Sequence, residues 1–293
     1  MLKRTTGEKV FAVFNYTGMV LLSLIFLIPV WHVLMGSLSD PLQISAHSGI
    51  ILYPLGETTL GGYGLVMQNN SIVRSYGNTL LIVVSATALG TFLTILASYV
   101  MSVRGLYWKK PINFLVTFTM IFNGGLIPTY MVVRNLNMLD TYWCLIIPGC
   151  CVAYNIIIMR TSFSQIPDAL SEAATIDGAG HFRILFQIIL PVSKAIIAVI
   201  VLFYAIQQWN AWFNASIYLQ NRDLYPLQLT LREIVLQSSE NSIVANADGE
   251  TADIYRPLIK YCSIMVSIIP MMIVYPFVQK YFVTGVMIGS VKG

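Results

Sequence analysis

The sequence predicts an all-α integral membrane protein with six transmembrane helices, both termini in the cytoplasm, and a cytoplasmic helix-turn-helix between the fourth and fifth spans. Three features predict this class: a low content of charged residues, six long apolar runs, and an uneven distribution of lysine and arginine. Of the 293 residues, 56% are hydrophobic and 10% are charged, and the mean hydropathy is +0.72. Because a soluble domain carries about 25% charged residues, a chain with so little charge could not cover its surface with polar groups.

Six apolar runs are long enough to cross a bilayer core of about 30 Å as helices. The first run follows the basic segment "MLKRTTGEK". It is too long for a signal peptide and no small-x-small cleavage site follows, so we expect a retained helix. We interpret residues 1–293 as a single transmembrane domain. Its expected spans are TM1 at about 13–37 and a TM2–TM6 core over about 79–282, with spans at about 79–101, 112–133, 141–159, 189–213 and 260–282.

Lysine and arginine orient the predicted spans, because the cytoplasmic loops of membrane proteins carry an excess of both. The outer loops, about 38–78 and 214–259, are the longer ones, and both termini and the segment about 165–191 are predicted to be cytoplasmic. Eleven basic residues fall on the inner side, namely Lys3, Arg4, Lys9, Arg104, Lys109, Lys110, Arg160, Arg183, Lys194, Lys280 and Lys292, and six on the outer side, namely Arg74, Arg134, Arg222, Arg232, Arg256 and Lys260.

The sequence argues against catalysis on this chain. The four cysteines have no metal or redox spacing, the three histidines are far apart, and no paired carboxylates or nucleophile–base arrangement marks an enzyme site. No lysine is followed by serine or threonine, so the phosphate loop of an ATPase is absent. No basic cluster suggests nucleic acid. We therefore predict no catalytic residue, no metal and no cofactor on this chain.

The segment about 165–191 differs from the apolar runs on either side of it. Pro167 is suited to a helix start. Asp168 and Glu172 follow it, and their negative charges would be stabilised by the positive N-terminal end of a helix dipole. Asp177 and Gly178 predict a turn, and a second short helix is expected from Ala179 to about Ile188, with Pro191 at the start of the next span. From these residues alone, a partner-binding surface and an ordinary interfacial loop are equally compatible with the pattern.

The same segment resembles the "EAA loop" of ABC importer permeases, whose pattern is E-A-A, three residues, G, nine residues, I-x-L-P. All seven fixed positions match, at Glu172, Ala173, Ala174, Gly178, Ile188, Leu190 and Pro191. The resemblance implies that the loop is a coupling helix that docks in a cleft of a separate ATPase subunit. Glu172 would face basic or polar groups of the ATPase, and Gly178 would permit the bend. The residues expected to couple are Glu172, Ala173, Ala174, Asp177, Gly178 and Ala179.

Further stretches resemble the LplC/MalG-type carbohydrate permeases, among them "NGGLIPTYMVVRNLNMLDT", "YPLQLTLREIV" and the C-terminal "GVMIGSVKG". The resemblance implies uptake of a sugar, with an oligosaccharide favoured, across a bacterial cytoplasmic (inner) membrane as a multi-pass protein in contact with membrane lipid. The implied partners are a second homologous permease, an extracytoplasmic solute-binding protein, and two copies of an ABC ATPase that bind ATP and Mg. Two alternatives remain: the same role for a non-sugar solute, and a stand-alone secondary transporter, which would normally carry ionisable residues inside its spans.

Two segments are candidates for the substrate pathway. "FNGGLIP" interrupts the third span with Asn123, Gly124, Gly125 and Pro128, and non-helical backbone within a membrane is tolerated only where protein or a water-filled cavity covers it. Simple kinking or close helix packing is the alternative. In "YAIQQWNAWFNA", amides and indoles gather at the outer half of span five, where they suit a sugar or serve as interfacial anchors. The candidates there are Gln208, Trp209, Asn210 and Trp212, with Asn155 in span four as a weaker one.

Overall fold

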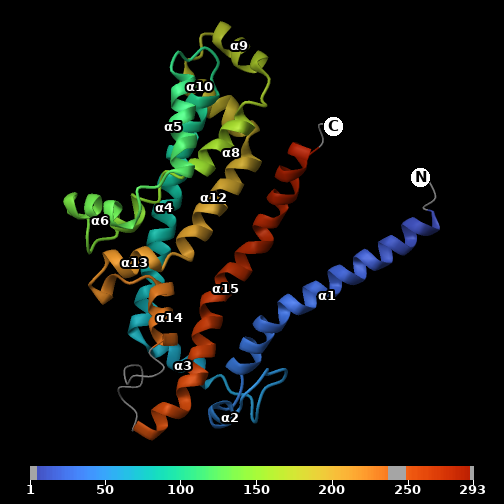
Figure 1. The fold of residues 1–293 in the computed structure, drawn as a ribbon, viewed down its shortest axis with the longest axis vertical. Helices are drawn as coiled ribbons and strands as arrows, with labels where there is room; N and C mark the ends of the chain where they lie inside the picture. Colours follow the sequence, from blue (N-terminus) through green and yellow to red (C-terminus); the bar gives the residue numbers. More distant parts are fainter. Residues whose placement is uncertain (1–4, 237–248, 291–293) are drawn as a thin grey trace. The chain divides into compact units, whose positions relative to one another are not determined.

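The structure, a computed structural model, describes residues 5–236 and 249–290, and all regular secondary structure in these ranges is helical (Figure 1). The predicted all-α class is thereby confirmed for the described residues. By their contacts the residues form two compact units, one of Met1–Asn70 and Glu233–Ile269, the other of Ser71–Arg232 and Pro270–Gly293.

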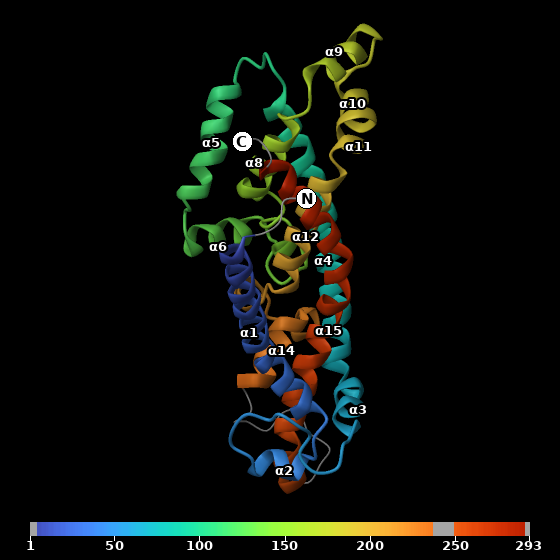
Figure 2. The same cartoon turned by 90° about the vertical axis from the view of Figure 1, so that its right-hand side faces the viewer.

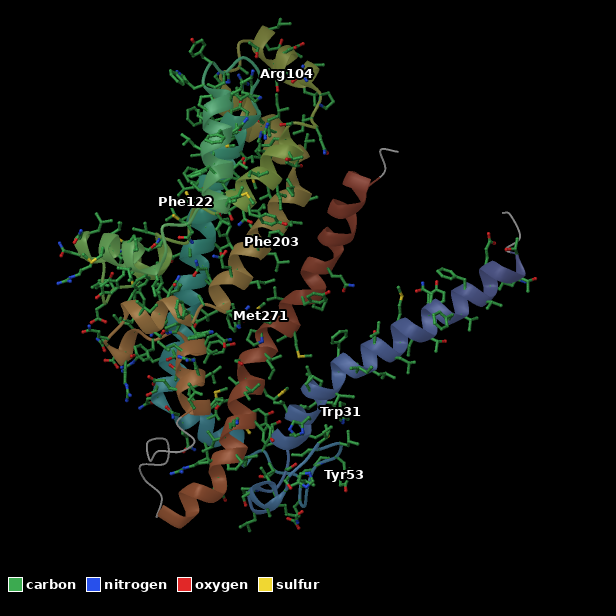
Figure 3. All side chains as sticks on the ribbon, in the orientation of Figure 1. Trp31, Tyr53, Arg104, Phe122, Phe203 and Met271 are labelled. Carbon is green, nitrogen blue, oxygen red and sulfur yellow. The ribbon has the colours of Figure 1, made fainter. Side chains whose placement is uncertain are left out.

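The first unit contains α1 (Thr6–Ser37), α2 (Pro41–Ala46), α3 (Gly61–Gln68) and α15 (Gly249–Ser290) as far as Ile269. A capping box starts α1: the Thr5 N–H donates to Glu8 Oε2 over 2.8 Å, and the Glu8 N–H donates back to Thr5 Oγ1. Both α2 and α3 lie beside the N-terminal half of α15 (Figures 1 and 2). Along most of α1 the apolar side chains project outward, as expected of a surface that faces hydrocarbon (Figure 3).

Polar contacts close the end of this unit at which α1 meets α15. His32 Nδ1 accepts the Ile51 N–H over 2.9 Å, and His32 Nε2 lies 3.2 Å from the Tyr261 hydroxyl. The hydroxyls of Ser37 and Tyr63 share a 2.7 Å hydrogen bond. Burial raises the pKa of Tyr63, and the bond from Ser37 opposes that shift. These contacts hold the connection between α1 and α3 against α15.

The second unit is organised around α4 (Asn70–Ser102), whose buried face carries polar side chains at helical spacing. Ser98 Oγ donates to the Ile156 carbonyl over 2.9 Å, and Ser75 and Thr230 share a 2.7 Å bond. In a membrane helix, such groups are placed against protein rather than lipid. Around α4 lie α5 (Lys109–Ile121), α6 (Leu126–Asn135), α7 (Trp143–Ile146), α8 (Ala153–Phe163), α9 (Asp168–Ile176), α10 (His181–Ile184), the π-helix η1 (Leu185–Ile189), α11 (Leu190–Val192), α12 (Lys194–Trp209), α13 (Phe213–Tyr218), the 3₁₀ helix η2 (Arg222–Leu224) and α14 (Leu227–Leu236).

Tyr204 of α12 joins α4 to the break between α7 and α8. Its fully buried hydroxyl donates to the Cys150 carbonyl over 3.2 Å and accepts the Val152 N–H over 3.2 Å. The Thr94 hydroxyl of α4 lies 2.7 Å away and supplies the remaining hydrogen bond. One side chain therefore satisfies two backbone groups that the break releases from helical pairing.

Three helices of the described residues are long and apolar enough to cross a membrane: Thr6–Ser37, Asn70–Ser102 and Tyr255–Pro276. Two bent pairs raise the number to five if each is one span. The chain bends by 113° between Lys109–Ile121 and Leu126–Asn135. It bends by 87° between His181–Val192 and Lys194–Trp209. Expected spans one, two and six coincide with long helices, and span three bends at the predicted "FNGG". The count of six and the orientation stay predictions.

The fourth expected span differs most from an uninterrupted helix. Only α7 and α8 are helical in residues 141–159, and the segment 147–152 between them contains Pro148 and Gly149. Proline lacks the N–H that would continue the helical ladder, and its ring clashes with the preceding turn. The run is apolar enough for a span, but its helix is interrupted in the middle.

The Tyr204 ring packs directly against Gly90 of α4, where a side chain would collide with it. A Cβ at Gly90 would lie 2.9 Å from Tyr204 Cε1, whereas a Cβ at Gly77 of the same helix would meet no atom within 4 Å. We expect Gly90→Ala to lower the free energy of unfolding by about 1–3 kcal/mol, the usual cost of overpacking. Gly77→Ala should leave it unchanged or raise it slightly. Unfolding in detergent micelles measures both variants, and equal stability would contradict this role for Gly90.

Candidate functional site

The segment predicted to be a helix-turn-helix is α9 followed by a turn at Gly178. Beyond the last residue of α9, the Gly178 N–H donates to the Thr175 carbonyl over 3.0 Å, and the Ala179 N–H donates to the Ala174 carbonyl over 2.9 Å. This pair of bonds is a Schellman motif, which satisfies carbonyls that a helix C-terminus leaves free. Gly178 has a φ of +79°, in the left-handed region that glycine adopts most readily. The EAA and glycine positions are therefore parts of one helix-ending motif.

Some residues of the motif pack against the rest of the unit, and the others are exposed. Ala174 and Ala179 are half-buried and pack against an apolar cluster that includes Met159, Ile184 and Leu185. Glu172, Ala173 and Asp177 are exposed. The two half-buried alanines fix the turn to the body of the unit, so the remaining residues present an exposed face of known orientation.

Charged side chains tie α9 to the end of α4. Arg104 Nη2 lies 2.5 Å from Asp168 Oδ2, and Asp168 is the first residue of α9, where a carboxylate also complements the helix dipole. A cavity of about 840 Å³ lies beside this pair and is lined in part by Arg160, Glu172 and His181. Arg104 is labelled near α9 in Figure 3. Charged side chains therefore lie around the start of α9, on the side that faces α4.

The second arm of the helix-turn-helix is longer than predicted. The helical run continues through η1 and α11 to Val192 rather than ending near Ile188, and the 87° bend follows at Ser193. Pro191 lies inside α11. Because proline cannot donate to the carbonyl four residues earlier, the ladder widens to the π-helix η1 immediately before it. The bend into α12 therefore comes two residues after the predicted proline.

The candidates in "FNGGLIP" form the exposed bend between α5 and α6. Asn123 Oδ1 accepts the Gly125 N–H over 2.9 Å, which caps the break locally. Asn123, Gly124 and Gly125 are all exposed within this chain. The break is where the sequence predicted it, with a polar side chain and free backbone groups on its surface.

The amide and indole candidates are not assembled into one open site. Gln208 and Trp209 are buried, Trp212 is half-buried and Asn210 is exposed. A Cβ at Gly149 would lie 2.7 Å from Gln208 Nε2, so that amide packs directly against the break between α7 and α8. The guanidinium of Arg232 lies 4.0 Å from the centre of the Trp212 ring and covers one face.

Asn155 of α8, the weaker candidate, has an unusual environment. Its side chain is 2% exposed, and among the residues that the structure describes its Nδ2 has no hydrogen-bond partner. A buried amide N–H group without a partner carries a desolvation cost of about 1–3 kcal/mol. This is the kind of group that a polar ligand or a rearranged neighbour would satisfy.

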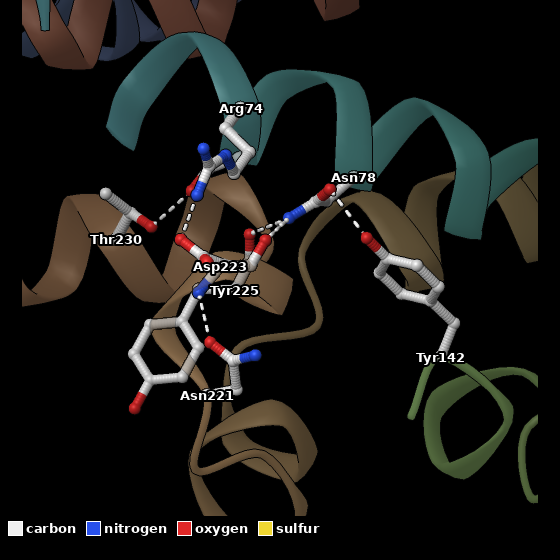
Figure 4. A network of polar contacts seen from close by, with 8 residues as sticks. Arg74, Asn78, Tyr142, Asn221, Asp223, Tyr225 and Thr230 are labelled. Carbon is white, nitrogen blue, oxygen red and sulfur yellow. Dashed lines mark hydrogen bonds and ion pairs between the residues drawn. The ribbon is translucent and has the colours of Figure 1, made fainter. Parts of the chain in front are cut away.

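Two sets of residues have structural roles that the sequence did not predict. One is the Tyr204, Thr94 and Gly90 contact. The other is the polar network of Figure 4, in which Arg74 of α4 pairs with Asp223, and Asn78 Nδ2 donates to the Asp223 carbonyl over 2.8 Å and to that of Tyr225 over 3.1 Å. Tyr142 donates to Asn78 Oδ1 over 2.8 Å. The available signal was the spacing of small and polar residues along the apolar run of α4.

Comparison with known proteins places the chain among transport permeases. No protein-family model matches it. The chain is 38% identical over 286 residues, 98% of this chain and 99% of the relative, to YtcP of Bacillus subtilis (strain 168), named a polygalacturonan/rhamnogalacturonan transport system permease protein. It is 35% identical over 295 residues, 100% of this chain and 98% of the relative, to LplC of the same organism.

A solved structure shares the fold over the same length. It is a crystal structure of a bacterial ABC transporter involved in the import of the acidic polysaccharide alginate. The match has a TM-score of 0.86 and 29% sequence identity, and covers 96% of this chain and 100% of that chain.

Gly178 and Gly180 offer a matched test of the turn. Gly178→Ala places a Cβ on a left-handed residue, at a cost of about 1–2 kcal/mol. Gly180 has a φ of −75°, and a Cβ there would meet nothing within 4 Å. We expect Gly178→Ala to raise amide hydrogen exchange in the last turn of α9 roughly tenfold, because 1.4 kcal/mol corresponds to a factor of ten. Gly180→Ala should not change it. Similar exchange in both variants would mean that the left-handed residue does not hold the turn.

Proposed function

The chain belongs to the permease subunits of carbohydrate ABC transporters, and from that premise we propose that it forms, with a second homologous permease, the pathway for an oligosaccharide that is driven through by a separate ATPase. The resemblance predicted from the EAA motif is confirmed by YtcP and LplC, which this chain matches over nearly its full length. The chain is therefore a membrane-embedded transport subunit for sugar import. The exposed surface of α9 supports the rest of the proposed assembly.

The observation that carries the proposal is the exposed face of a helix closed by the Schellman motif. Glu172, Ala173 and Asp177 project from α9, while Ala174 and Ala179 anchor its end. Two ABC ATPase subunits, which bind ATP and Mg, grip α9 and the equivalent helix of the second permease. Glu172 faces basic or polar groups of the ATPase, and the small side chain of Ala173 allows close approach.

A displacement of α9 reaches the membrane helices through packed contacts. Ala174 and Ala179 pack on the cluster that contains Met159 of α8 and Tyr204 of α12. The Arg104–Asp168 pair connects the start of α9 to the end of α4. Closure of the ATPase dimer moves these elements together and switches the pathway between inward-open and outward-open states. Such elements transmit force because packed interiors are close to incompressible.

In this proposal the chain lies in a bacterial cytoplasmic (inner) membrane as six spans with both termini inside. The bent pairs α5–α6 and α10–α12 count as spans three and five, and the interrupted α7–α8 counts as span four. An extracytoplasmic binding protein delivers the sugar to the outer loops. Asn155 and the α5–α6 bend supply polar groups to the pathway, and Gln208, Trp209, Asn210 and Trp212 contribute once the conformation changes. The buried Nδ2 of Asn155, which has no hydrogen-bond partner in the described part of the chain, supports this assignment.

We assign an acidic oligosaccharide as the cargo. YtcP is named for polygalacturonan and rhamnogalacturonan, and the transporter with the matching structure imports the acidic polysaccharide alginate. Three arginines outside the predicted spans, Arg134, Arg222 and Arg232, are exposed and have the charge that attracts a carboxylate. A non-sugar solute is the alternative, but it would not account for the similarity of this chain to sugar-transporting relatives.

Glu172→Lys tests the coupling surface. The substitution reverses the charge of an exposed residue and should leave the chain folded and inserted, but lower ATP-dependent sugar uptake in proteoliposomes at least tenfold. The matched control is Glu172→Asp, which keeps the negative charge at the same exposed position. Uptake and the ATPase rate are measured together, since uncoupling lowers the first more than the second. Normal uptake by the Glu172→Lys importer would show that this face does not couple.

The cargo is tested by competition among oligosaccharides of equal length. Oligogalacturonides should bind the associated binding protein and drive ATP-dependent uptake at least tenfold better than maltodextrins, because only the former carry a carboxylate on each sugar. Uptake of the oligogalacturonides should also weaken as salt screens the charges. Preference for the neutral sugar would contradict the acidic cargo, and uptake of neither would favour the non-sugar alternative.

A further inference from the structure

The inner end of α4 carries an apolar cavity whose function the coupling surface does not explain. The cavity has a volume of about 420 Å³ and lies between the end of α4 and α10. Its walls are almost entirely apolar, formed by Leu96, Tyr99, Val100, Val103, Leu106, His181, Phe182 and Leu185. Phe182 and Val100 are both exposed, so the cavity opens to the outside of the unit.

This cavity adjoins the larger one beside α9, which is lined in part by basic side chains. Tyr99, Val103 and His181 line both cavities, and the Tyr99 hydroxyl lies 3.3 Å from His181 Nδ1. The larger cavity is also lined by three basic residues, Arg104, Lys109 and Arg160, and by two acidic ones, Glu172 and the Asp168 that pairs with Arg104, so its lining carries a net positive charge. The apolar cavity and this larger, cationic cavity thus share a wall formed by Tyr99, Val103 and His181.

Arg160 is the basic residue of this cavity that has a buried N–H group without a partner among the described residues. Arg104 is paired with Asp168, and Lys109 Nζ donates to the carbonyls of Ser102 and Val103 over 3.0 and 2.9 Å. Arg160 is half-buried, and among the described residues its Nε is buried without a hydrogen-bond partner. A buried guanidinium N–H without a partner is costly. An anion in the cationic cavity would supply that partner.

Neighbouring residues place the two cavities at the level of the membrane surface. Tyr107 and Trp108 follow the end of α4, and both are exposed. Their rings pack edge to face, with 5.7 Å between the ring centres. Tyrosine and tryptophan gather at the boundary between hydrocarbon and headgroups. Lys110 is also exposed there. The apolar cavity therefore faces acyl chains while the cationic cavity lies at the depth of lipid phosphates.

We propose that the junction of α4 and α10 binds one anionic glycerophospholipid, with an acyl chain in the apolar cavity and its phosphate at the cationic cavity close to Arg160. Basic pockets between membrane helices at the cytoplasmic surface recognise such headgroups. The bound lipid fills the space between the end of α4 and α10, two elements that flank the coupling helix. It therefore makes the rigid connection of α9 to the membrane dependent on the lipid composition.

The test is native mass spectrometry of the assembled importer after delipidation, titrated with phosphatidylglycerol or with phosphatidylcholine of the same acyl chains. We expect one phosphatidylglycerol per copy of this chain, bound at least tenfold more tightly than phosphatidylcholine. Arg160→Gln should weaken phosphatidylglycerol at least fivefold, and Val100→Trp, which fills the apolar cavity, should do the same. Arg183→Gln is the matched control, because Arg183 is an exposed arginine of α10 that lines neither cavity.

Several outcomes would overturn the proposal. Equal binding of the two lipids, wild-type affinity in Arg160→Gln, or equal weakening in Arg183→Gln would leave only nonspecific attraction to the surface. Displacement by glycerol phosphate at equal concentration would identify a phosphate site that needs no acyl chain. Binding to the permease pair that is lost when the ATPase is added would assign the cavity to the ATPase instead. Should Arg160→Gln fail to assemble, Val100→Trp decides alone, because it changes no charge.

Discussion

The hydroxyl of Tyr204 is the contact on which the second unit depends. The chain breaks between α7 and α8, and inside a membrane the released backbone groups must find partners within the protein. Tyr204 supplies them, at Cys150 and Val152, and its third bond to Thr94 fixes the break to α4. Without this contact, α8 would lose its fixed position relative to α4 and α12.

The position of α8 decides the position of the coupling segment. Met159 and Phe163 of α8 form, with Tyr204, the cluster on which Ala174 and Ala179 pack. At its other end, α4 is held by the Arg74, Asn78 and Tyr142 network of Figure 4. One helix is therefore held by polar contacts near both of its ends, with the turn at Gly178 attached near one of them. A unit built in this way can pass a displacement of α9 to the membrane helices, because its members cannot shift independently.

Local chemistry predicted the all-α class and the two main breaks in the chain, at the α5–α6 bend and at Gly178. Low charge and long apolar runs indicated the class, and the glycines at the α5–α6 bend and at Gly178 predicted both turns. The interruption at Pro148 was not predicted, because a proline in an apolar run usually kinks a helix rather than ending it. The burial of Gln208 and Trp209 could not be predicted either. Amides and indoles at a helix end suit a sugar and a protein interior equally, and the contacts that bury these two come from residues distant in sequence, Gly149 and Tyr76.

The most direct test of the account is the composition of the complex that holds this chain. The tagged chain, extracted from its native membrane in mild detergent, would be purified and its partners identified by mass spectrometry. The account predicts an ABC ATPase and a second, homologous permease in the same complex, with the ATPase alone lost when Gly178→Asp distorts the end of α9. If the chain purifies by itself and still moves a solute in vesicles, transport does not depend on a separate ATPase, and the account is wrong.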